Sequence, residues 1–335
     1  QFDWCQSLVV TDYIKEVYKR QVEEPNLEEK LKKQLSKLGE ITDSVSLEVG
    51  AQYEEQPYPR WINLRLPLKP ISISEVVDEI ELKLPNREII EVENPEILIT
   101  GCGTGQNSIG TASRIKGSKV LAIDLSLSSL AYAKRKTEEF GIENIEYMQA
   151  DILDLGQLKK KFDIIESGGV LHHMDNPKTG WKVLTNCLKT GGLMKIGLYS
   201  ELARNNIVTI REEIRQLNIG ATIAEMKSFR DTVIRSDNDH HKLILNFPDF
   251  YSLSELRDLL FHVQEHRFTI NQIKGHLDEL GLKFCGFEAD KIVSHFKQTY
   301  KNKGDPYNLD KWQIYEECNP TVFASMYQFW CQKIT

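Results

Sequence analysis

A glycine-rich segment after a short apolar run is the first feature that could do chemistry. The apolar run spans 96–100, residues 101–105 read Gly-Cys-Gly-Thr-Gly, and a helical pattern follows. Glycine lets a ligand approach the backbone closely, and the start of a helix offers free N–H groups to an anion. The dinucleotide fingerprint needs glycine where Gln106 stands, and a Walker loop needs a following Gly-Lys-Ser/Thr, so the spacing matches neither.

Two acidic residues stand at the ends of the next apolar runs. Asp124 closes the run 119–124, where a carboxylate can accept hydrogen bonds from both hydroxyls of a ribose. Asp151 follows the run 145–149 and can accept a hydrogen bond from an adenine amino group beside the apolar Ile152. The set describes a pocket for a nucleoside that carries an amino-acid tail. The alternative is that these residues have only structural roles: the glycines form a tight turn between strand and helix, and Asp124 caps the helix that follows.

The elements that would hold these residues alternate between strand and helix. The expected strands are 96–100, 119–124, 145–149, 162–166 and 192–198, with helices over 127–139 and 177–189 among them. This alternation predicts an α/β fold with a parallel, Rossmann-like sheet covered by helices on both faces. Residues 201–266 interrupt it with helical patterns at 201–217 and 254–261. A helix at 269–280, a strand at 282–288 and an edge strand within 321–333 then complete the sheet.

The segment before the sheet predicts helices and an irregular arm. Residues 12–38 have helical leucine spacing interrupted near Pro25, and Ser72 marks the start of another helix. The stretch 53–61 is aromatic and proline-rich, so we expect no regular helix there. The expected divisions are a helical segment with its arm over 1–90, the cofactor-binding core over 91–200, a helical insertion over 201–266 and the end of the core over 267–335.

Four motifs in this order resemble the class I S-adenosylmethionine-dependent methyltransferases. They are Ile-Leu-Ile-Thr-Gly-Cys-Gly-Thr-Gly, Ala-Ile-Asp, Ala-Asp-Ile, and Phe-Asp-Ile-Ile-Glu-Ser-Gly-Gly-Val-Leu-His-His-Met, all within about 95–200. The resemblance implies a seven-stranded sheet with an antiparallel last strand, S-adenosylmethionine as cofactor and S-adenosylhomocysteine as product. The cofactor-binding residues it implies are Gly101, Gly103, Gly105, Gln106 and Asn107 at the methionyl part, Asp124 and Leu125 at the ribose, Asp151 and Ile152 at the adenine, and Ser167.

The arm resembles more narrowly that of bacterial methyltransferases that carry tetratricopeptide repeats before the catalytic domain. Its motif is Tyr-Glu-Glu-x-Pro-Tyr-Pro-Arg-Trp, and such repeats are missing from this sequence, which begins at Gln1. The resemblance suggests an upstream partner-binding module. Tyr58, Arg60 and Trp61 are candidate substrate-binding residues, because a guanidinium and aromatic rings beside prolines suit a rigid wall. The alternative is an arm that packs its rings on the sheet.

Histidines supply the candidate catalytic groups. His172 and His173 follow the strand at 162–166, beside the place where this fold holds the reacting methyl group, and imidazole titrates near neutral pH. Either ring is a candidate general base, and the alternative is that both shape the loop. The pattern His-x-x-Glu-His at 262–266 and the run 237–241 contain ligand types for zinc. We interpret them as a chance match and a solvated loop, and expect no metal.

Composition limits the class of protein. Lysine and arginine total 42 against 49 acidic residues, giving a formal charge of −7, which disfavours broad nucleic-acid binding. No apolar run is long enough to span a membrane, and six cysteines without a C-x-x-C pair suit a reduced compartment, so we expect a cytoplasmic protein.

The expected function is methyl transfer by direct displacement to an N or O acceptor, on a protein or peptide. Three alternatives stay open: a small-molecule acceptor, a catalytically inactive binding or scaffold protein with this fold, and a nicotinamide oxidoreductase, which Gln106 disfavours.

Overall fold

The computed structural model describes residues 8–334 and contains one mostly parallel sheet, of eight strands in the order β1-β4-β3-β2-β5-β6-β8-β7. The strands are β1 (Ser36–Lys37), β2 (Glu96–Thr100), β3 (Lys119–Asp124), β4 (Ile145–Gln149), β5 (Phe162–Gly168), β6 (Leu188–Leu198), β7 (Leu282–Phe287) and β8 (Tyr327–Lys333). All pairs among β1 to β6 are parallel, and β8 is antiparallel to both β6 and β7. The predicted α/β architecture is confirmed, with the short β1 added at one edge.

The prediction that the tail forms an edge strand is wrong. β8 lies between β6 and β7, and β7 forms that edge of the sheet. The reason is visible in β8 itself, because the side chains of Tyr327, Phe329 and Cys331 are fully buried. A strand with so little exposed surface needs a hydrogen-bonded neighbour on each side. The strand also begins at Tyr327, six residues later than expected.

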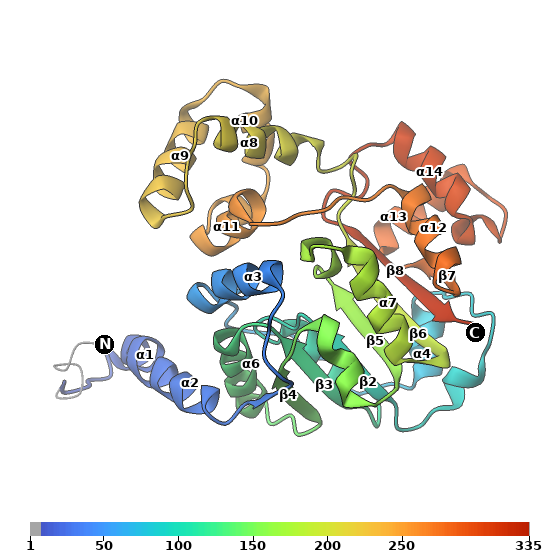
Figure 1. Ribbon diagram of the computed structural model, residues 1–335, viewed down its shortest axis with the longest axis horizontal. Coiled ribbons are helices and arrows are strands. Elements are labelled where there is room, and N and C mark those ends of the chain that lie inside the picture. Colours follow the sequence, from blue (N-terminus) through green and yellow to red (C-terminus); the bar gives the residue numbers. More distant parts are fainter. Residues whose placement is uncertain (1–7, 335) are drawn as a thin grey trace.

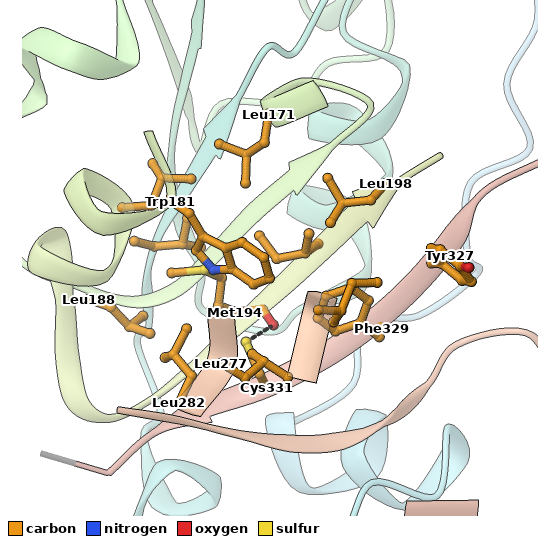
Figure 2. Packing of buried hydrophobic residues seen from close by; sticks show 14 of the residues in the cluster. Leu171, Trp181, Leu188, Met194, Leu198, Leu277, Leu282, Tyr327, Phe329 and Cys331 are labelled. Atoms are coloured by element: carbon orange, nitrogen blue, oxygen red, sulfur yellow. Dashed lines mark hydrogen bonds between the residues drawn. The ribbon is translucent and has the colours of Figure 1, made fainter. Parts of the chain in front are cut away.

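Helices cover both faces of the sheet, as expected (Figure 1). One face carries α2 (Glu24–Lys32), α4 (Ile73–Glu79), α5 (Gln106–Arg114) and α6 (Leu127–Glu139); the other carries α7 (Pro177–Cys187), α12 (Ile270–Glu279), α13 (Asp290–Thr299) and α14 (Leu309–Cys318). Strand side chains alternate between the two cores: Ile97 and Ile99 of β2 point to the first, and Leu98 to the second. Figure 2 shows the second core, where Trp181 packs near Phe329 and the Cys331 thiol donates to the Met194 carbonyl at 3.5 Å.

The N-terminal segment is helical, as predicted, but its first helices end at Lys32, before the strand β1, and are not interrupted at Pro25. α1 (Lys15–Tyr18) continues through a π-helical turn (Lys19–Glu23) into α2, and Pro25 sits in the first turn of α2 without ending the helix. α3 (Ser44–Glu55) includes the first residues of the stretch predicted to be irregular. The proline effect begins only after Gln56, so the arm is shorter than expected.

The helical insertion, residues 201–266, holds four helices around a core of its own: α8 (Asn205–Gln216), α9 (Ile223–Arg235), α10 (Asp239–Ile244) and α11 (Leu253–Phe261). Figure 1 shows these helices beyond the carboxyl ends of the strands, with α11 above α3. The interpretation of 237–241 as a solvated loop is wrong in part, because α10 begins at Asp239 and His241 is buried against Glu213 at 2.7 Å. None of the helices within residues 8–334 is long and apolar enough to cross a membrane.

Candidate active site

A cavity of about 940 Å³ opens at the carboxyl ends of β2, β3, β5 and β6. Open parallel sheets bind ligands at this edge, and the volume is at the upper end for a small-molecule site. Of the residues expected at the cofactor, those lining the cavity are Gly101, Gly103, Gln106, Asn107, Asp124, Leu125, Asp151 and Ile152. The cavity also extends to side chains of α3, the arm and α11, so it has room for more than one ligand.

The glycine loop needs glycine for space as well as for conformation. Gly101, Gly103 and Gly105 all have positive φ, at 57°, 51° and 88°. A Cβ on Gly101 would lie 2.3 Å from the Val170 side chain, and one on Gly103 would lie 2.7 Å from the Tyr58 carbonyl oxygen. The glycine loop therefore packs closely against Val170, which follows β5, and against the arm at Tyr58. Gly101 and Gly103 also line the cavity, so a ligand there can contact their backbone. Gly105 caps α5 and does not line the cavity.

Asp124 joins the glycine loop to the end of β3. Its Oδ2 accepts the Gly103 N–H at 2.8 Å and its Oδ1 accepts the Ser126 N–H at 2.9 Å. Burial raises the pKa of the carboxyl group above its ordinary value, and the backbone hydrogen bonds oppose that shift. Each oxygen keeps a further lone pair, so the carboxylate remains able to accept two hydroxyl groups.

The helix α3 covers the side of the cavity beside Asp124. The Glu54 carboxylate accepts hydrogen bonds from Ser126 and Ser128 at the start of α6, and Val49 lines the cavity. Asp151 lies next to this wall; its Oδ1 accepts the Leu153 N–H at 2.9 Å, and burial raises its pKa. This end of the cavity therefore suits a planar ring that packs on apolar side chains and donates a hydrogen bond from an amino group to Asp151.

A buried carboxylate that the motifs did not single out organises the other side of the glycine loop. Glu166 of β5 lines the cavity, and it accepts hydrogen bonds from the Asn107 amide at 2.9 Å and the Thr111 hydroxyl at 3.0 Å. Ser167 beside it is fully buried and is not among the lining residues, because alternate side chains of a strand face opposite sides of the sheet.

The three candidate residues of the arm differ in position. One of them lines the cavity, and another packs the arm against the rest of the protein. Tyr58 lines the cavity, whereas Arg60 is exposed and outside it. The Trp61 ring is buried between Tyr132 and Phe140, and its Nε1 donates to the Thr104 carbonyl at 3.2 Å. Trp61 therefore anchors the arm on the glycine loop, which is the packing role given above as the alternative.

His172 and His173 form a buried pair with a fixed proton arrangement. His173 Nδ1 lies 2.7 Å from the Gln264 carbonyl oxygen, which can only accept, so this nitrogen carries the proton. His173 Nε2 then holds a lone pair, which faces His172 Nε2 at 3.1 Å. His173 lines the cavity and His172 does not. The lone pair that a general base would use is therefore directed to its neighbour.

Lowering the pH through 6.5 is expected to leave both rings of this pair mostly neutral. Burial lowers the pKa of both rings below the ordinary value of about 6.5. The pKa of His172 lies well below that value because His173 adds to the effect, whereas the charge of Asp258 opposes the shift of His173. Ring nitrogen chemical shifts would follow this directly, with the urea-unfolded chain as control. Since the unfolded chain gains these protons, stability falls as the pH drops below about 6.5. Titration of either folded ring near pH 6.5 would contradict the assignment.

A third histidine joins this pair. Side chains of His173, Asp258 and His262 bring three possible metal ligands within 4.8 Å of one another, and the rings of His173 and His262 stack at 3.6 Å. However, His262 Nδ1 accepts the Gln264 N–H at 3.2 Å, so the neutral ring carries its proton on Nε2 and offers no lone pair there. This proton arrangement suits a hydrogen-bonding cluster better than a metal centre, and the absence of a metal stays a prediction.

The residues 262–266 do not have the geometry of a zinc-protease motif. They follow the end of α11 and are not helical. The Glu265 carboxylate binds Arg204 at 2.5 Å and Arg211 at 3.0 Å, so it is committed to ion pairs. These observations favour a chance match of sequence, which stays a prediction.

Sequence reasoning missed three side chains at the far end of the cavity. Tyr53 of α3, Tyr199 after β6 and Asp258 of α11 all line it. The Tyr53 hydroxyl donates to Asp258 Oδ1 at 2.5 Å, which connects α3 to the insertion. Tyr53 begins the motif of the arm but was not singled out there, and no motif marks Tyr199 or Asp258. We call Tyr53, Tyr58, His173, Tyr199 and Asp258 the acceptor end of the cavity.

Residues 97–192 match the model of a family described as a methyltransferase domain. An uncharacterized protein of Synechococcus is 27% identical over 67% of this chain and 57% of its own length. A malonyl-[acyl-carrier protein] O-methyltransferase of Methylovorus is 22% identical over 68% of this chain and 80% of its own length.

Among solved structures, PKMT2 from Rickettsia typhi in complex with AdoHcy aligns with a TM-score of 0.61 and 18% identity, over 83% of this chain and 55% of that one. The chain thus spans little more than half the length of the Synechococcus and Rickettsia proteins. The matched family region runs from β2 to the first residues of β6 and contains the glycine loop, Asp124 and Asp151. Residues 97–192 therefore match a methyltransferase domain, and the fold of the chain is that of a solved structure that holds AdoHcy.

Proposed function

We propose that this chain transfers a methyl group from S-adenosylmethionine, by direct displacement, to a nitrogen or oxygen acceptor. The observation that carries the proposal is a single cavity that joins the glycine loop, Asp124 and Asp151 to the acceptor end. S-adenosylmethionine, the cofactor of the family, supplies a methyl group activated on a sulfonium. The protein contributes alignment of the acceptor and exclusion of water, which are the main requirements of such a displacement.

The lining residues fit the chemical groups of this cofactor. Asp124 would accept both ribose hydroxyls with its free lone pairs, and Asp151 would accept the adenine amino group beside Ile152. The backbone at Gly101 and Gly103 would pack on the methionyl part, because side chains there would fill the space. The Glu166 carboxylate suits the α-ammonium, and Gln106 and Asn107 lie near the same end of α5.

The catalytic role of the histidines is a narrower proposal. His173 lines the cavity, so it would position the acceptor or take its proton once the contact with His172 rearranges. His172 would act through His173, because it lies behind it and stacks on Tyr199 with ring centroids 4.0 Å apart. Turnover by His172→Ala and His173→Ala tests these roles. If either variant turns over like the wild type, that histidine has no catalytic role.

We propose that the acceptor group belongs to a protein or peptide. The support is the resemblance of the arm to that of methyltransferases with tetratricopeptide repeats, which suggests a partner-binding module. A small-molecule acceptor is the alternative. Incubation with methyl-labelled donor and a cell extract separates the two, since label enters either macromolecules or the small-molecule fraction. Donor binding without label in either fraction would instead indicate an inactive binding protein.

Asp124→Ala is expected to weaken cofactor binding roughly 10–100-fold, because it removes charged hydrogen-bond acceptors worth about 1.5–3 kcal/mol from a buried site. Calorimetric titration of S-adenosylhomocysteine measures the change. Asp278→Ala, on the exposed surface of α12, is the matched control and should bind like the wild type. Failure of the wild type to bind would overturn the proposed function, and equal binding by Asp124→Ala would remove Asp124 from it.

A further inference from the structure

We infer that the methyl acceptor is a primary amine, which enters as its ammonium ion between Asp258 and the tyrosines of the acceptor end. The inference rests on the proposed function and names the chemical class of its acceptor. It follows from the charge and the unused hydrogen-bonding groups at this end of the cavity.

Asp258 supplies a negative charge with one oxygen uncommitted. The residue is 9% exposed, its Oδ1 accepts the Tyr53 hydroxyl, and its Oδ2 has no hydrogen bond or ion pair with any residue between 8 and 334. A buried carboxylate without a cationic partner is costly unless a ligand supplies the opposite charge. Asp258 also lines the cavity, so a bound ligand would reach it.

The tyrosines add neutral acceptors and aromatic surface. Burial raises the pKa of Tyr53, Tyr58 and Tyr199, so their hydroxyls stay protonated at working pH. The hydroxyls of Tyr58 and Tyr199 make no hydrogen bond within the described part of the chain, and the rings of Tyr53 and Tyr58 stack with centroids 6.5 Å apart. An ammonium ion has three N–H donors, which match Asp258 Oδ2 and the two free hydroxyls, and a cation is also attracted to aromatic faces.

The surrounding charges favour a cation over an anion. Burial raises the pKa of both Asp249 and Glu255. The charge of Asp258 adds to the shift of Asp249, and the charges of Asp249 and, more weakly, Asp258 add to that of Glu255. Arg204 and Arg211 lie behind this end, but the Glu265 carboxylate binds both at 2.5 and 3.0 Å. A carboxylate acceptor would therefore meet the charge of Asp258 without a free cation to compensate it.

A hydroxyl acceptor lacks a prepared base at this end. It must lose a proton as it attacks, and the lone pair of His173 Nε2 is directed to His172. An amine differs, because its ammonium ion releases one proton to water before reaction and the free amine attacks unaided. The balance is R–NH3⁺ plus methyl sulfonium giving R–NH2⁺–CH3, thioether and H⁺: a C–N bond forms, the C–S bond breaks, and sulfur keeps the electron pair. Asp258 faces a cation before and after the reaction.

The test is the chemistry of the label that the wild-type protein transfers from methyl-labelled S-adenosylmethionine into a cell extract. We expect the label to survive mild alkali, which releases methyl esters as methanol, and after acid hydrolysis to bind a cation exchanger as a methylamine. Acetylation of extract amines beforehand should abolish incorporation, whereas amidation of carboxyl groups should not. Label lost in alkali, or kept after amine acetylation, would overturn the amine proposal and leave methyl transfer standing.

Variants link this result to the acceptor end. Asp258→Asn should reduce incorporation about 10–100-fold while calorimetric binding of S-adenosylhomocysteine stays within about twofold of wild type. Asp258→Glu, which keeps the charge, should recover part of the activity, and Asp278→Asn is the surface control. Unchanged incorporation by Asp258→Asn overturns the role of Asp258. If the wild type binds the product but labels no fraction, methyl transfer itself fails, and the amine proposal with it.

Discussion

Gly103→Ala is expected to weaken cofactor binding by about 100-fold or more. Gly103 has a φ of 51°, a left-handed conformation that costs a residue with a Cβ about 1–2 kcal/mol. The added Cβ would also lie 2.7 Å from the Tyr58 carbonyl oxygen, a backbone atom that cannot rotate away. The arm would have to move off the glycine loop, breaking the hydrogen bond from the Thr104 hydroxyl to the Pro59 carbonyl. Calorimetric titration of S-adenosylhomocysteine checks the expectation.

A second glycine separates this effect from a general response to the substitution. Gly275 lies within α12, and a Cβ there meets no atom within 4 Å. Gly275→Ala should bind the cofactor like wild type and gain up to about 1 kcal/mol of stability, because alanine favours a helix. If Gly103→Ala also binds like wild type, the contact between the arm and the glycine loop does not shape the site.

The sequence predicts well those elements whose bounds depend on neighbouring residues, such as short apolar runs between turns and capped helices. The strands β2 to β5 begin where expected, because buried parallel strands are short apolar runs bounded by turns. α6 and α12 lie within one residue of their expected bounds, since Ser126 and Thr269 cap them. The glycines and acids at strand ends reach one edge of the sheet for the same reason: parallel strands place their carboxyl ends together.

Long-range packing explains most of what the sequence did not predict. An apolar run such as 327–333 is compatible with any position in a sheet, and its place between β6 and β7 depends on which faces the other elements cover. The acceptor end shows the same limit at the site. Tyr53 and Asp258 meet although 205 positions separate them, and neither the arm motif that begins at Tyr53 nor any spacing around Asp258 predicts this contact. Residues near the cofactor follow motifs, whereas those at the acceptor end depend on how the insertion folds over α3.

Glu265→Gln is expected to destabilise the protein by about 3–5 kcal/mol, the cost of leaving a buried charge unpaired. The Glu265 side chain is 1% exposed and that of Arg204 is 4% exposed. The carboxylate binds Arg204 at the start of the insertion and Arg211 on α8, so it fastens both ends of the insertion together. Removing the charge leaves the buried guanidinium group of Arg204 and the partly buried one of Arg211 in need of a partner. Urea unfolding measures the loss, and hydrogen exchange should place the first opening in 201–266.

The pH dependence of this ion pair gives an independent check with a defined sign. Burial alone would raise the pKa of Glu265, but the charge of Arg204 and its hydrogen bonds lower it below the ordinary 4.5. A depressed pKa means that the stabilisation is complete above about pH 4.5 and is lost as the pH falls through the lower, folded-state value. Glu265→Gln should therefore lose this acid-dependent part. Glu212→Gln, which breaks a solvent-exposed pair with Arg215, should leave stability near neutral pH almost unchanged, because solvent screens this pair. If both variants behave alike, the insertion is held by its apolar core and not by this ion pair.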